Sequence, residues 1–137
     1  MKEIEFKCWN VEEKIMHDIA FPSWNGSVEV WANNIPQSEI QYLSINGPVE
    51  HGVLLQFTNI LDKRKNKIFD KDILIEDQSK NIGVVEFKNG TWKIRFIKPY
   101  RQRSSRVASV VGLGSIAKFF SKIGNLYENP KLITVDN

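Results

Sequence analysis

The stretch LQFTNILDKRKNKIFDKDILIEDQSKNIGVVEF, residues 55–87, decides the fold of this chain. It contains three runs that either alternate between apolar and polar residues or are rich in β-branched residues, as strands are. Two polar segments separate these runs and predict solvated turns. The runs are Leu55–Thr58, Ile73–Ile75 and Gly83–Phe87, and the turns are Asp62–Asn66 and Gln78–Asn81.

A hairpin follows this stretch directly. The segment Lys88-Asn89-Gly90 predicts a tight turn, because Asn-Gly readily supplies positive φ angles. Thr91–Ile97 then alternates strictly, with Trp92, Ile94 and Phe96 on one face. Short strands separated by turns every eight to twelve residues, roughly, indicate a strongly bent sheet. We therefore expect a mainly β fold, with a small SH3-like, partly open barrel over residues 49–137.

The first 48 residues form a separate N-terminal β region in this interpretation. A strand over Lys2–Trp9, a turn over Asn10–Lys14 and a return strand over Ile15–Ile19 predict a β-hairpin. Ser27–Trp31 alternates briefly and predicts another strand. Ser38–Ser44 is compatible with either a short strand or one helical turn.

The C-terminal part is less regular. Val107–Gly114 is apolar but contains two glycines, so it is either a strand or an arm exchanged between subunits. Ser115 is a candidate cap for a short helix over residues 116–123. The apolar residues of that helix are spaced so as to share one face, as in an amphipathic helix. They are Ile116, Phe119, Phe120 and Ile123.

Length and composition favour one globular domain covering residues 1–137. Apolar residues make up 42% of the chain and charged residues 26%. No apolar run reaches the roughly 18 residues that a membrane span requires. The first ten residues lack the apolar core of a signal peptide. A single cysteine, Cys8, cannot form an internal disulfide, so we expect a cytoplasmic protein with Cys8 as a packing residue.

The charges are unevenly distributed although the net charge is only +3. Residues 91–122 contain eight bases and no acid, and Tyr100 lies among the bases of the loop. Such a segment can neutralise phosphates and stack a base, or it can contact an acidic protein surface. The candidate nucleic-acid-binding or partner-binding residues are Lys93, Arg95, Lys98, Tyr100, Arg101, Arg103 and Arg106.

We find no set of residues that predicts catalysis. His17 and His51 are isolated, and metal sites need several ligands at fixed spacing. Asp70 and Asp72 lie at i and i+2, which could serve acid–base or Mg²⁺ chemistry, but their place at a strand entry favours a role in a turn. We therefore expect a protein that is not an enzyme and has no metal or cofactor.

Four segments together resemble the YopX family of phage and prophage proteins. The segment KEIEFKCWN resembles that family's R-E-I-K-F-R-A-W-D. Residues 55–63 followed by residues 66–74 resemble its Q-Y-T-G-L-K-D-K-N-G-K-E-I-Y-E-G-D-I-V. Residues 83–86 read GVVE, and residues 123–132 resemble I-G-N-I-Y-E-N-P-E-L-L. The four segments lie in the same order and cover roughly a third of the chain, including both ends and the middle.

The resemblance implies a phage origin and a mainly β fold with a small-barrel element. It implies no activity and no catalytic residues. Asn59 and Lys71 stand where the family has Gly, so these turns either avoid positive φ or tolerate strain. We expect a non-enzymatic interaction module that forms a homo-oligomer or binds a phage or host protein. We expect no association with a membrane. The alternative is a nucleic-acid-binding accessory protein that uses residues 93–106.

Overall fold

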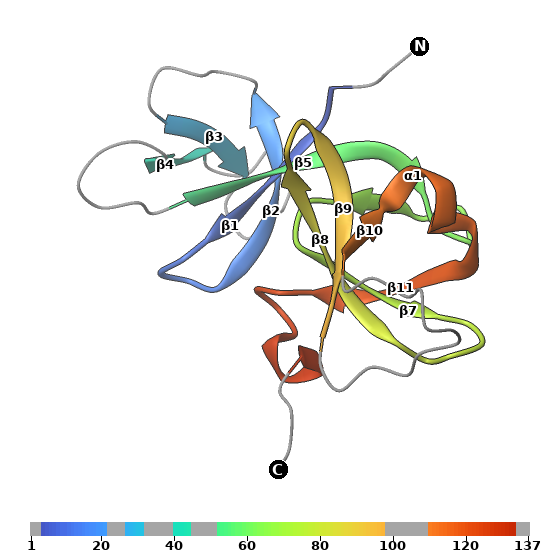
Figure 1. The fold of residues 1–137 in the computed structure, drawn as a ribbon. Helices are drawn as coiled ribbons and strands as arrows, with labels where there is room; N and C mark the ends of the chain where they lie inside the picture. Colours follow the sequence, from blue (N-terminus) through green and yellow to red (C-terminus); the bar gives the residue numbers. More distant parts are fainter. Residues whose placement is uncertain (1–3, 22–26, 32–39, 45–51, 98–109, 134–137) are drawn as a thin grey trace. The chain divides into compact units, whose positions relative to one another are not determined.

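The computed structural model describes residues 4–21, 27–31, 40–44, 52–97 and 110–133 (Figure 1). The chain forms two compact units, one spanning Ile4–Gln56 and the other beginning at Phe57. The division falls inside strand β5 (Gly52–Leu61), whose first half pairs in one unit and whose second half pairs in the other. We describe each unit separately.

The N-terminal unit is an antiparallel sheet in the order β4-β3-β2-β1-β5. Its predicted hairpin is confirmed, since Trp9 of β1 pairs with Met16 of β2. Lys14 closes the turn with a φ of 58° and donates its backbone N–H to the carbonyl of Asn10. Cys8 is buried in this unit's apolar cluster. The remaining strands of the unit are β1 (Phe6–Asn10), β2 (Ile15–Phe21), β3 (Ser27–Trp31) and β4 (Ile40–Ser44).

The second unit contains a five-stranded antiparallel sheet in the order β10-β9-β8-β7-β11, and a short pairing of β5 with β6. Asn89 and Gly90 adopt φ angles of 51° and 81° and connect β8 to β9, as their sequence predicts. Its strands are β6 (Lys67–Phe69), β7 (Asp72–Glu76), β8 (Ile82–Lys88), β9 (Thr91–Phe96), β10 (Val110–Gly112) and β11 (Phe120–Asn125). Its short helical segments are α1 (Leu113–Ile116), η2 (Ala117–Phe119) and η3 (Pro130–Ile133).

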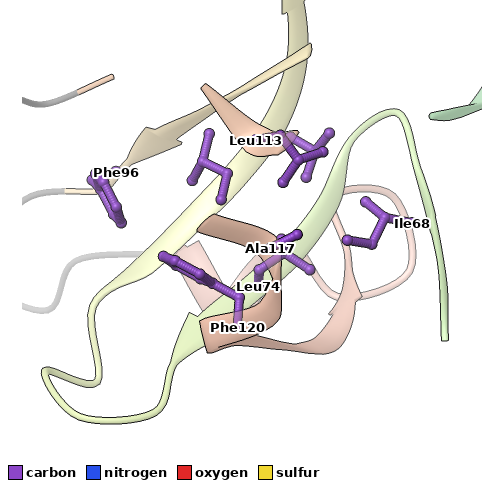
Figure 2. Close-up of a cluster of buried hydrophobic side chains, with 8 residues drawn as sticks. Ile68, Leu74, Phe96, Leu113, Ala117 and Phe120 are labelled. Carbon is purple, nitrogen blue, oxygen red and sulfur yellow. The ribbon is translucent and has the colours of Figure 1, made fainter. Parts of the chain in front are cut away.

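The core of this second unit lies between the sheet and the α1–η2 segment (Figure 2). Ile94 and Phe96 are buried there and Trp92 packs against them, so the predicted apolar face of this strand is confirmed. Leu113 is fully buried at the start of α1. Its burial explains why the apolar residues 110–113 lie against the sheet of their own unit. The buried members are Ile68, Leu74, Val85, Ile94, Phe96, Leu113, Ala117 and Phe120.

The short helix predicted near residues 116–123 is present but lies earlier in the chain, and the prediction is wrong for residues 120–123. The helical segment is α1, which begins at Leu113 after Gly112 as the N-cap, not after Ser115, and η2 ends at Phe119. Residues 120–125 instead form β11, which pairs with β7 across a bulge at Ile123. The bulge turns Ile123 outward and leaves its side chain exposed. At the edge of the sheet, the backbone of residues 120–125 forms its hydrogen bonds with β7, so a strand replaces the predicted helix there.

The mainly β fold class is confirmed, with two antiparallel sheets. Strand pairing in the described ranges closes no barrel, and the SH3-like description stays a prediction, as does the single domain. The ambiguous segment 38–44 contains a strand, β4. No helix in the described ranges is both long and apolar enough to cross a membrane.

Candidate functional site

Two of the predicted basic residues, Lys93 and Arg95, lie on β9. Arg95 donates from Nε to Oε1 of Glu86 and forms an ion pair with it. Lys93 stands directly opposite Glu86 in the β8–β9 ladder. One carboxylate on the neighbouring strand therefore offsets part of this positive charge. The other predicted positions lie outside the described residues, namely Lys98, Tyr100, Arg101, Arg103 and Arg106.

The apolar segment before α1 has partners within its own chain. Val110 and Val111 pair with Arg95 and Ile94 of β9, and Leu113 is buried in the core. The strand interpretation of this segment is therefore correct for residues 110–112. Exchange of this segment between subunits is expected only if the segment lacks partners in its own chain, which does not hold for residues 110–112. Self-association itself stays a prediction.

Asp70 and Asp72 have different surroundings. Asp70 lies in the turn between β6 and β7, where its carboxylate is 3.3 Å from Nζ of Lys71. Asp72 is buried, and its Oδ2 accepts a hydrogen bond of 2.7 Å from the backbone N–H of Phe69 and lies 3.0 Å from Nζ of Lys122. This arrangement agrees with the interpretation of both residues as turn and strand-entry groups.

Cys8 and His17 are both fully buried in the N-terminal unit. Burial raises the pKa of the Cys8 thiol to about 11, only partly opposed by a backbone hydrogen bond involving Val53. A thiol in this state is inert at neutral pH, which fits the packing role predicted for it. Nε2 of His17 lies 3.5 Å from Nδ2 of Asn10. The described part of the chain holds no group of three metal-ligating side chains.

A pair of aromatic rings lies at the end of the β8–β9 hairpin. Phe87 is 56% exposed and stands directly opposite Trp92, with ring centroids 5.1 Å apart and planes inclined by 68°. Trp92 in turn packs against the core of the second unit. The exposed ring is therefore held on a rigid base, and it faces away from the Lys93 side of the strand because neighbours in a strand alternate.

Sequence reasoning missed a second basic surface in the β5–β6 loop. Lys63, Arg64, Lys65 and Lys67 are exposed, while Asp62 at the start of the loop is buried. The signal is present as the run DKRKNK, which by itself predicts only a solvated turn. What sequence alone could not indicate is that β11 brings the exposed Phe119 beside this loop.

The segment that follows β11 is a network of side-chain hydrogen bonds to backbone. Oδ1 of Asn125 accepts from the N–H groups of Tyr127 and Glu128, at 3.0 and 2.8 Å. Oδ1 of Asn129 accepts from the N–H of Asn125 at 3.1 Å. A Cβ atom on Gly124 would lie 2.4 Å from this same Oδ1, so the close approach requires glycine.

A family model described as YopX protein matches residues 5–134. The chain belongs to the YopX family. The four sequence segments that resemble the family are thus part of a match that spans nearly the whole chain. A comparison with curated proteins found no match.

Two solved structures share this YopX fold. Protein EF1440 from Enterococcus faecalis has 22% sequence identity and a TM-score of 0.63. Protein yopX from Bacillus subtilis has 17% identity and a TM-score of 0.62. Each alignment covers 98% of this chain and 100% of the other chain. Identities this low show a shared fold alone.

Residues of the YopX segments have structural roles, either in close packing or in positions with positive φ. Gly83 belongs to one of them, and a Cβ there would lie 2.2 Å from Cγ2 of Ile94. Asn59 and Lys71, which replace the family's glycines, keep positive φ angles of 64° and 65°. Both residues therefore adopt positive φ and tolerate its strain, which decides between the alternatives left by the sequence.

Proposed function

We propose that this YopX-family protein is a phage- or prophage-encoded, non-enzymatic interaction module acting in the bacterial cytoplasm. It binds a protein, either a second copy of itself or a phage or host protein, through the end of the β8–β9 hairpin. The observation that carries the proposal is the exposure of Phe87 on the rigid base formed by Trp92.

Physical chemistry supports a protein partner for this surface. A ring that is 56% exposed leaves apolar area in water, and burying it against a partner is favourable. Aromatic residues supported by packed neighbours often dominate the binding energy of interfaces. The hairpin turn residues around Phe87, from Lys88 to Thr91, are all exposed, so a partner can reach the ring.

The test compares wild type with Phe87→Ser, using Phe119→Ser as a matched control because Phe119 is similarly exposed, at 51%. Sedimentation velocity over a wide concentration range reports self-association. Immobilised protein is then used to isolate partners, each of which is purified and titrated directly. We expect Phe87→Ser to weaken the contact by about 30-fold or more, as for an interface hot spot. Association that is unchanged in Phe87→Ser would overturn the assignment of this surface.

The alternative is nucleic-acid binding through residues 93–106. In its favour, Lys93 and Arg95 share one face of β9 at the surface of the second unit. Against it, Glu86 lies on the same face and forms an ion pair with Arg95. Loss of oligonucleotide binding in a Lys93→Gln/Arg95→Gln variant would favour this alternative.

A further inference from the structure

The β5–β6 loop has a defined conformation because a buried carboxylate organises it. Oδ1 of Asp62 accepts from the N–H groups of Arg64 and Asn66, each at 2.8 Å. The loop closes through a backbone bond of 2.9 Å from Asp62 N–H to the Asn66 carbonyl. The positively charged side chains on this loop are therefore presented by a fixed backbone.

The same carboxylate ties the loop to β11. Oδ2 of Asp62 accepts from the N–H of Lys122 at 2.8 Å, and the N–H of Lys63 donates to the carbonyl of Phe120 at 2.9 Å. These bonds place the residues just before β11 beside the loop. Among them are Lys118 and Phe119, both exposed, with Nζ of Lys118 5.3 Å from the Phe119 ring centroid.

We name this surface the loop patch, and it consists of Lys63, Arg64, Lys65, Lys67, Lys118 and Phe119. Asp62 is buried and directs its oxygens to backbone donors, whereas Asp77 pairs with Lys63. Within the described ranges, Arg64, Lys65 and Lys118 form no ion pair. Their charges remain available to a ligand.

The backbone of the loop turns at Lys65. Its φ is 68°, a left-handed conformation that costs an L-residue roughly 1 kcal/mol and that Gly or Asn adopts more easily. Lys65 is exposed and donates only its backbone N–H to the loop, at 3.0 Å to the Asp62 carbonyl.

We propose that the loop patch binds single-stranded nucleic acid, with its lysines and arginine on the phosphates and Phe119 stacking on a base. Arg64, Lys65 and Lys118, which form no ion pair in the described part of the chain, can neutralise phosphates of the nucleic-acid backbone. An exposed aromatic ring among them favours a single strand, because unpaired bases can leave their neighbours and stack on a side chain. None of these residues belongs to the β8–β9 hairpin, which carries Phe87, Lys93 and Arg95.

The test is fluorescence anisotropy with a short labelled oligothymidylate between about 50 and 200 mM salt. Arg64→Gln/Lys65→Gln should reduce the slope of log affinity against log salt by about 1.4, since each single-strand phosphate contact contributes about 0.7. Phe119→Leu should weaken binding by about 5- to 150-fold and leave that slope unchanged. Lys88→Gln, an exposed lysine on the β8–β9 hairpin, is the matched control and should bind as wild type does.

Three results would overturn the proposal. The first is no binding at about 50 mM salt, where nonspecific phosphate contacts are strong. The second is a loss in Lys88→Gln that is about half or more of the loss in Arg64→Gln/Lys65→Gln, which would indicate an effect of net charge rather than a site, because the control removes one charge and the double variant removes two. The third is weak binding of oligothymidylate together with binding of polyglutamate. If polyglutamate binding is lost in Arg64→Gln/Lys65→Gln but retained in Phe119→Leu, the partner is an acidic peptide. Phe87→Ser should leave oligothymidylate binding intact, so this test is independent of the protein-binding surface.

Discussion

Nζ of Lys122 lies 3.0 Å from Oδ2 of Asp72 and joins β11 to the start of β7. The side chain of Asp72 is 4% exposed and that of Lys122 is 23% exposed, so water screens this pair only in part. The same carboxylate oxygen accepts from the N–H of Phe69, and Nζ of Lys122 lies 5.6 Å from the Phe69 ring centroid. One acid thus connects a turn, a strand entry and a distant strand.

We expect Asp72→Asn to lower the free energy of unfolding by about 2–4 kcal/mol, because it leaves the Lys122 ammonium without its counter-charge in a largely dry site. Urea unfolding measures the change. Lys122→Met keeps the aliphatic stem and removes the charge, and the double variant completes a cycle. A coupling energy near zero would show that the two residues act independently.

Gly124 is the glycine whose replacement should cost most in this C-terminal segment. In Gly124→Ala the new Cβ would lie 2.4 Å from Oδ1 of Asn129, which also accepts the N–H of Asn125. We expect a loss of about 1–3 kcal/mol from the forced shift. Thermal or urea unfolding reports it.

Gly114→Ala is the control for that prediction. A Cβ at Gly114 meets nothing within 4 Å, and the residue lies inside α1. Alanine should leave stability unchanged or raise it by up to about 1 kcal/mol. Equal losses in the two variants would contradict the role assigned to Asn129.

Local signals allowed much of this fold to be predicted from sequence. The Asn89-Gly90 turn follows from two residues and their flanking strands. The helix over residues 116–123 failed because apolar spacing there fits both a helix and a bulged strand. Only β7, far away in sequence, decides between them. The loop patch could not be predicted for the same reason, since Phe119 reaches the loop through that non-local pairing.

Lys71 gives a test of backbone strain. Its φ of 65° favours glycine, which stands at this position in the family pattern. The free energy of unfolding of Lys71→Gly should exceed that of Lys71→Ala by about 1 kcal/mol, because only alanine has a Cβ that clashes at positive φ. Urea unfolding measures the difference. Both variants lack the partly exposed ion pair with Asp70, so that contribution cancels. Equal stability of the two variants would show that the turn relaxes away from positive φ.

The pH dependence of stability should report on Asp62. Burial acts to raise the pKa of this carboxyl, but hydrogen bonds from Lys122, Asn66 and Arg64 together outweigh it and hold the pKa below its usual 3.8. The folded protein therefore binds this proton more weakly than the unfolded chain does. Stability from Asp62 is complete above pH 3.8 and is lost as the pH falls through the lower folded-state value.

Asp62→Asn tests this linkage. At neutral pH the variant should be less stable by about 1–3 kcal/mol, because the amide cannot accept all the hydrogen bonds that the carboxylate accepts. This difference in the free energy of unfolding between wild type and Asp62→Asn should become smaller as the pH is lowered below 3.8, because Asp62 of the wild type then loses its negative charge. Asp77→Asn, which removes an ion pair at a partly exposed position, is the control and should change stability by less than about 1 kcal/mol. A gap for Asp62→Asn that stays constant from neutral pH into strong acid would mean that the charge of Asp62 does not stabilise the loop.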